Sequence, residues 1–118
     1  MKKIIHVDNS EFFRKLVKTY LAEQGLLMES YSHGATALEV IEGGDVGLIV
    51  TGLVLSDMDG MAFIKKAIAP PHNIPIVALT SSQDSEMEQE LHELGIKTCI
   101  LKSGAWQEEL MAAVNKYF

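Results

Sequence analysis

The alternation of short apolar segments with longer amphipathic ones is the feature of this sequence that most limits its fold. Five runs rich in Ile, Val and Leu predict buried strands, and they lie at residues 4–7, 27–31, 46–51, 74–79 and 98–101. Each run precedes a segment whose apolar residues recur at helical spacing, which predicts five helices. Strand–helix units with short connections predict a parallel sheet covered by helices on both faces, wound in the right-handed sense.

The ends of the predicted helices carry recognisable capping and breaking residues. Ser10 is placed to cap the first helix, and Gly25 stands where a glycine commonly ends one. Pro70 and Pro71 end the third helix, and Asp84 or Ser85 caps the fourth. These positions agree with the hydrophobic pattern and strengthen the α/β prediction.

Length, charge and hydropathy narrow the classes of function. The chain of 118 residues predicts a single domain over residues 1–118, whole or cut from a longer protein. Its net charge of −6 and its lack of a basic stripe argue against direct nucleic-acid binding. No apolar run approaches the ~20 residues of a membrane span, so we expect a cytoplasmic protein. The single cysteine, Cys99, excludes an internal disulfide, and the oligomeric state stays open.

Polar residues follow several of the predicted strands. A parallel α/β sheet places its ligand site beyond the carboxyl ends of its strands. The residues expected at that edge are Asp8, Asn9, Thr51, Gly52, Thr80, Ser81, Lys102 and Ser103.

Four segments resemble the response-regulator receiver family of two-component signalling. They are residues 5–10, 45–60, 75–80 and 100–102, and together the resemblance covers the whole chain. It implies a flavodoxin-like (βα)5 fold, with a five-stranded parallel sheet of order 2-1-3-4-5 in an α/β/α sandwich. It also implies a bacterial signalling protein. In that family an aspartate attacks the phosphorus of a phosphohistidine, a magnesium ion neutralises the developing charge, and a lysine and a threonine bind the phosphoryl oxygens.

The same resemblance places Gly52 at the position of the attacking aspartate. Glycine has no side chain and cannot be a nucleophile, so we expect no catalytic residue. Asn9 replaces one of the expected acids, which leaves Asp8 as the one carboxylate of an expected three, while Thr80 and Lys102 are retained. We therefore expect a degenerate phosphorylation pocket in which Lys102 neutralises Asp8 directly. Magnesium binding at Asp8 should be weak or absent, and no other cofactor is expected.

Further departures from the family pattern occur outside this pocket. Ser56 and Ser103 stand where the family has prolines, and Cys99 stands where it has an aromatic residue. One alternative is that Gly52 is an engineered change in an ordinary receiver. A single engineered site would not explain the other departures, which argues against that alternative.

Several other residues admit two interpretations. Asp57 and Asp59 could be displaced phosphoacceptors, but they suit the N-terminus of a helix, where carboxylates are favourable. His6 lies on a predicted buried strand and is expected to be a core histidine. The remaining histidines lack the spacing of metal ligands, so we expect no zinc site.

The first functional hypothesis is a pseudo-receiver, which acts by protein–protein interaction without phosphorylation. Its partner would be a histidine kinase, an output domain or another signalling protein. The alternative is a small-ligand-binding or enzymatic flavodoxin-like domain that uses the strand-end crevice. The loop of residues 8–10 is too short and too acidic for flavodoxin-type phosphate binding, which ranks that alternative lower.

The interaction face is expected on the fourth helix, the fifth strand and the fifth helix, as in the family. The acidic residues Glu86 and Glu90 mark this face, together with Gln83 and Glu93. Cys99 should leave a shallow recess beside the fifth strand. Trp106 is either a core residue or an aromatic anchor of the interface. The acidic helix predicts a basic partner surface.

Overall fold

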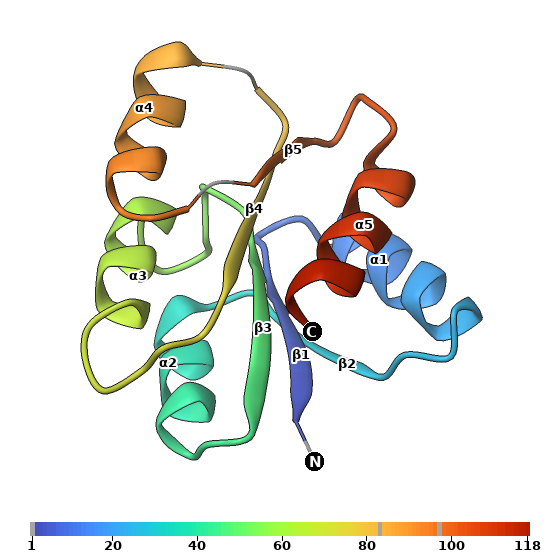
Figure 1. Ribbon diagram of the computed structural model, residues 1–118, viewed down its shortest axis with the longest axis horizontal. Coiled ribbons are helices and arrows are strands. Elements are labelled where there is room, and N and C mark those ends of the chain that lie inside the picture. The colour runs from blue at the N-terminus through green and yellow to red at the C-terminus, as the bar shows by residue number, and fades with distance from the viewer. Residues whose placement is uncertain (1, 83, 97) are drawn as a thin grey trace.

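The computed structural model describes residues 2–82, 84–96 and 98–118. Five parallel strands form one sheet in the order β2-β1-β3-β4-β5, which confirms the predicted topology (Figure 1). The strands are β1 (Lys3–Val7), β2 (Met28–Tyr31), β3 (Val46–Thr51), β4 (Ile76–Thr80) and β5 (Cys99–Leu101). The three central strands β1, β3 and β4 carry the longest apolar runs, because they are covered on both faces.

The helices pack in two layers. They are α1 (Glu11–Glu23), α2 (Gly34–Glu42), α3 (Gly60–Ala67), α4 (Ser85–Glu93) and α5 (Trp106–Tyr117). Helices α1 and α5 cover one face of the sheet, and α2, α3 and α4 cover the other (Figure 1). Each layer has its own hydrophobic cluster, one around Phe63 and Ile64 and one around Leu21 and Leu110. The predicted α/β/α sandwich is therefore confirmed.

Three of the predicted helix ends are confirmed, whereas the third helix ends at Ala67, before Pro70. Ser10 caps α1 by accepting a hydrogen bond from the backbone N–H of Phe13 at 3.2 Å. Gly25 follows the helix with a φ of +78°, a backbone conformation that glycine adopts without steric cost. Asp84, rather than Ser85, caps α4. These caps fix where each connecting loop leaves its helix.

Three predicted strands began too early in the sequence, among them the fifth, which starts at Cys99. The second strand starts at Met28, and Leu27 before it is 88% exposed. The fourth strand starts at Ile76 and runs on to Thr80. The ring of Pro75 leaves it without an N–H for the ladder, although its carbonyl still accepts a bond from Ile49 at 3.0 Å. Hydrophobicity alone did not locate these boundaries.

Within the described residues, none of the helices is both long enough and apolar enough to cross a bilayer.

Candidate functional site

The pocket predicted from the strand ends is assembled in the structure. Asp8 follows β1, Gly52 follows β3, and Lys102 follows β5, so the parallel strands deliver these residues to one edge of the sheet. A hollow of about 250 Å³ lies there. Its lining includes all five residues of the predicted degenerate pocket, namely Asp8, Asn9, Gly52, Thr80 and Lys102.

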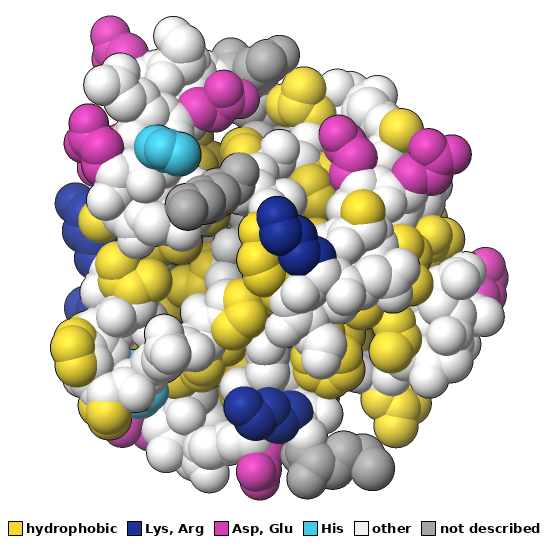
Figure 2. All heavy atoms as spheres, in the orientation of Figure 1, with side chains coloured by type: hydrophobic (Ala, Val, Ile, Leu, Met, Phe, Trp, Pro, Cys, Tyr) yellow, Lys and Arg dark blue, Asp and Glu magenta, His cyan; other side chains and the backbone are white. Residues whose placement is uncertain are grey.

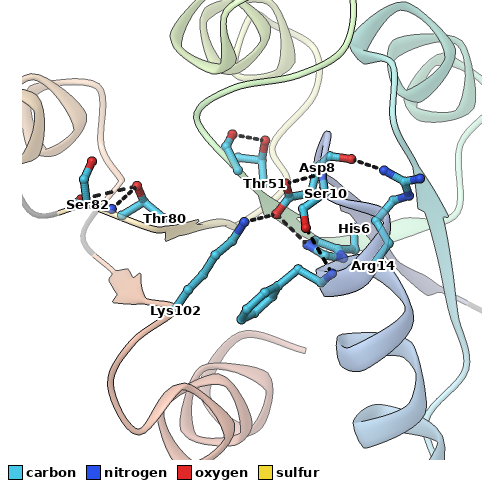
Figure 3. A network of polar contacts seen from close by, with 10 residues as sticks. His6, Asp8, Ser10, Arg14, Thr51, Thr80, Ser82 and Lys102 are labelled. Carbon is cyan, nitrogen blue, oxygen red and sulfur yellow. Dashed lines mark hydrogen bonds and ion pairs between the residues drawn. The ribbon is translucent and has the colours of Figure 1, made fainter.

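Asp8 and Lys102 form a buried ion pair at the centre of this edge. The Lys102 Nζ lies 2.7 Å from Asp8 Oδ2, and the Asp8 side chain is only 1% exposed (Figure 3). The other carboxylate oxygen accepts the backbone N–H of Ser10 at 3.0 Å. Burial opposes ionisation of Asp8, but contacts with His6, Lys102 and the Ser10 N–H outweigh it and hold the pKa below its usual range. The carboxylate is thus ionised and already neutralised by this chain.

Gly52 gives the Asp8 carboxylate its room. A Cβ atom at Gly52 would lie 3.1 Å from Asp8 Cγ and 3.2 and 3.3 Å from its two oxygens. Those distances are tighter than ordinary van der Waals contacts, so a side chain here would push Asp8 aside. The paired Asp8 carboxylate therefore faces position 52 directly.

His6 lies beneath the ion pair as a fully buried residue of β1. Its Nε2 is 3.7 Å from Asp8 Oδ2, and within the described residues neither ring nitrogen has a hydrogen-bond partner. Burial lowers the pKa of His6 in spite of the nearby carboxylate, so the ring is neutral at pH 7. The predicted core histidine is confirmed. Its proximity to Asp8 was not predicted, although side chains two positions apart in an extended chain point to the same side.

An aromatic cluster holds Lys102 from the other side. The Lys102 ammonium lies 4.7 Å from the ring centroid of Phe13, within the range of a cation–π contact. The Phe13 and Tyr20 rings pack at 5.4 and 5.5 Å from that of Trp106. Trp106 is only 5% exposed, so its interpretation as an exposed interface anchor is wrong and its interpretation as a core residue is confirmed.

The threonine hydroxyls in and next to the pocket bond to nearby backbone groups. Thr80 Oγ1 lies 3.3 Å from both the backbone N and the carbonyl O of Ser82. Thr51 Oγ1 donates to the carbonyl of Gly52 at 2.8 Å. Asn9 is exposed, and its backbone N–H donates to Val54. These groups serve the local backbone.

One contact of Asp8 was missed by the sequence analysis. Arg14, one turn into α1, donates from Nη1 to the backbone carbonyl of Asp8 at 2.6 Å (Figure 3). The sequence offered one indication of this contact: Arg14 is the chain's single arginine, and it lies six residues after Asp8. The bond ties α1 to the end of β1.

Asp57 and Asp59 both occupy helix N-termini. Asp59 caps α3 by accepting the N–H of Met61 at 3.2 Å. Asp57 reaches α2 and accepts the N–H groups of Gly34 and Ala35 at 2.7 and 3.0 Å. The backbone bonds lower the pKa of Asp57, most of all the bond from Ala35. The interpretation as helix-terminal carboxylates is confirmed.

The donor set at the pocket does not fit a magnesium ion. Magnesium needs carboxylate oxygens in near-octahedral geometry. Asp8 is the pocket's carboxylate, and both of its oxygens already face a cation or an N–H group. In the part of the chain that the structure describes, no group of three or more His, Cys, Asp or Glu side chains could hold a metal.

The predicted interaction face is acidic around an apolar centre. Glu86 and Glu90 are exposed on α4, and Glu90 lies 3.6 Å from Lys65 of α3. Figure 2 shows acidic side chains over α4 and near the start of α5, with hydrophobic side chains between them. A hollow of about 230 Å³ adjoins half-buried Cys99 and is floored by Ala112 and Ala113 of α5, so the expected recess is present. Gln83 lies outside the described residues.

Comparison with known proteins places this architecture in one family. The family model described as "Response regulator receiver domain" matches residues 4–115. Sporulation initiation phosphotransferase F of Bacillus subtilis is 27% identical over 116 residues, covering 98% of this chain and 93% of that protein. The transcriptional regulatory protein YhcZ of the same organism is 32% identical over 102 residues, covering 85% of this chain but 48% of that protein. Several of the relatives are thus much longer than this chain.

The fold comparison agrees. The chemotaxis response regulator CheY4 of Vibrio cholerae superposes with a TM-score of 0.86 at 24% identity, covering 100% of this chain and 99% of that one. The alternative of a small-ligand-binding or enzymatic flavodoxin-like domain is not favoured by these matches. The chain belongs to the response regulator receiver domain family.

Proposed function

We propose that this chain is a receiver-type signalling module that is not phosphorylated at position 52 and acts by binding another protein. Its setting would be a two-component or phosphorelay pathway in the bacterial cytoplasm. Its partner would be a histidine kinase, an output domain or another signalling protein.

The observation that carries the proposal is the ion pair facing Gly52. Phosphoryl transfer to a receiver needs a carboxylate nucleophile, a metal and a free lysine for the phosphoryl oxygens. Here position 52 has no side chain, and Lys102 is engaged with Asp8 at 2.7 Å. The pocket is therefore satisfied by its own residues and offers an incoming phosphoryl group no nucleophile.

The electrostatic energy of this pocket favours the Asp8–Lys102 pair without a bound cation. Three carboxylates within about 5 Å of one another would repel by a few kcal/mol per pair at an effective dielectric near 20. Gly52 and Asn9 remove two of those charges. The remaining charge on Asp8 is compensated by Lys102, so stability does not depend on a bound cation.

The acidic face provides a surface for the partner. Glu86 and Glu90 are exposed on α4, and the lining of the recess beside Cys99 includes a further acid, Glu109 of α5. A basic partner surface with an apolar side chain at its centre is complementary to this arrangement. Because these charges are exposed, association should slow as salt is added.

The test is titration of the purified partner with folded variants of this face, each with and without acetyl phosphate and Mg²⁺. Glu90→Lys should weaken binding by reversing a charge, and Cys99→Tyr by filling the recess, each by about tenfold or more. Glu39→Lys, the same charge reversal on exposed α2, is the matched control and should bind normally.

No variant should need acetyl phosphate in order to bind. Normal binding by both face variants would move the interface elsewhere, most simply to α1. Binding that appears only with acetyl phosphate would refute the phosphorylation-independent mechanism.

A further inference from the structure

A second hollow opens at the same edge of the sheet, between the end of β2 and the start of α2. Its volume is about 300 Å³. It is lined by Arg14, Ser30, Tyr31, Ser32, His33 and Thr36. Every one of these side chains carries an N–H or O–H group, and none is a carboxylate. That composition is typical of oxyanion sites and differs from that of the pocket at Gly52.

Arg14 is held in place at this hollow. It is half-buried, and the 2.6 Å bond from its Nη1 to the Asp8 carbonyl fixes the guanidinium plane. The bond uses one of the five guanidinium N–H groups and leaves the others for a ligand. A planar guanidinium with a free fork is the side chain best suited to bind phosphate oxygens in a bidentate manner.

The hydroxyls and the histidine around Arg14 complete a donor set. Ser32 Oγ lies 2.7 Å from His33 Nδ1, so this contact does not use the other ring nitrogen, His33 Nε2. Within the described residues, the hydroxyls of Ser30 and Thr36 have no hydrogen-bond partner. Tyr31 is excluded as a donor, because its hydroxyl is bonded to Glu29 at 2.5 Å.

We propose that this hollow binds a phosphate monoester, with its phosphoryl oxygens on Arg14 and on the hydroxyls of Ser30 and Thr36. Asp57 already occupies the first N–H groups of α2, so the site depends on side-chain donors rather than on the helix terminus. Asp57 and Glu29 also place negative charge nearby, which predicts weak, millimolar binding. This site is independent of the proposed absence of phosphorylation at position 52.

Binding here would act on the centre of the degenerate pocket. Arg14 contacts the backbone of the same residue whose side chain pairs with Lys102.

The experiment is an amide NMR titration with methyl phosphate at constant ionic strength. The wild-type protein should show saturable shifts for the amides from Ser30 to Thr36 and for the Arg14 side chain. Arg14→Gln should weaken binding at least about tenfold, because it removes charge-assisted hydrogen bonds. Lys18→Gln removes the same charge from an exposed position of α1 and should leave the affinity unchanged.

A second variant keeps the test decisive if Arg14→Gln does not fold. The pair Ser30→Ala with Thr36→Val retains Arg14 and should weaken methyl phosphate several-fold. Parallel titrations with inorganic phosphate and sulfate separate a monoester site from a general oxyanion site, and tighter binding of methyl phosphate is expected. The proposal is overturned if Arg14→Gln and Lys18→Gln weaken methyl phosphate binding equally. It is also overturned if the amide shifts centre on Gly52 and Lys102, or if the titration does not saturate.

Discussion

Asp8 contacts several other residues at this edge of the sheet, through both its side chain and its backbone. Its carboxylate pairs with Lys102 and accepts the Ser10 N–H, and its carbonyl accepts from Arg14. The absence of a side chain at Gly52 gives that carboxylate its space. The absence of a side chain at position 52 and the position of the paired Asp8 carboxylate are therefore linked.

Breaking this ion pair from one side should be costly. Lys102→Met would leave the Asp8 charge buried without its partner and should lower the free energy of unfolding by about 3 kcal/mol. The double change Asp8→Asn with Lys102→Met should recover much of that loss, because no buried charge remains. Urea denaturation measures both. Lys66→Met, on the exposed side of α3, is the control and should change stability by less than about 0.5 kcal/mol. A Lys102→Met variant as stable as the Lys66→Met variant would contradict this account.

His6 should make stability depend on pH. Burial lowers the pKa of folded His6, whereas the unfolded side chain titrates near its ordinary value of about 6.5. The unfolded chain therefore binds more protons below that pH, so stability is full above about pH 6.5 and falls as the pH drops below it. His6→Gln should reduce the loss of stability between pH 7.5 and pH 5, as measured by urea denaturation. His92→Gln, at an exposed position, should not. An unchanged loss in His6→Gln would show that other groups cause it.

At the scale of elements, α4 is the most weakly anchored helix. Leu91 is its one fully buried side chain, and Met87 and Leu94 are only partly buried against the same core. By contrast, α5 buries Trp106, Leu110, Ala113 and Val114. A helix with few buried apolar contacts opens at a lower free energy than the rest of the domain.

Hydrogen exchange should show this difference directly. The amides of α4 should exchange faster than those of α1 and α5 in the native protein. Leu91→Ala should accelerate α4 alone, whereas Leu110→Ala should accelerate exchange throughout the domain by lowering its overall stability. Equal protection of α4 and α5 in the unmodified protein would mean that α4 is as firmly held as the core.

The elements themselves followed from the sequence, because hydrophobic period and capping residues are local properties. The convergence of Asp8, Gly52 and Lys102 also followed, since parallel strands end at one edge. The sequence left two interpretations of Trp106 open, because its burial depends on Phe13 and Tyr20 of α1, which are contacts distant in sequence. The bond from Arg14 to Asp8 was missed for the same reason, since it depends on the path of the loop between β1 and α1.

At the scale of the whole molecule, the receiver architecture is complete, and we propose that its reactive centre is changed. All five strands and their order are those of the family, and the family model spans residues 4–115. The changes concentrate at one edge, where Gly52 and Asn9 leave a single carboxylate that Lys102 compensates. Under the proposed function, such a module acts through protein partners and does not depend on phosphoryl transfer.

The most direct test of that claim is the intact mass of the protein after incubation with acetyl phosphate and Mg²⁺. The wild-type chain should retain its unmodified mass. The variant with Asn9→Asp and Gly52→Asp is the comparison: it restores two carboxylates, and it should bind Mg²⁺ more tightly while losing stability without the metal, because like charges return. A stoichiometric, base-labile phosphoryl adduct on the wild-type protein would contradict the central claim, whereas an unmodified mass under conditions that phosphorylate a conventional receiver is the result we predict.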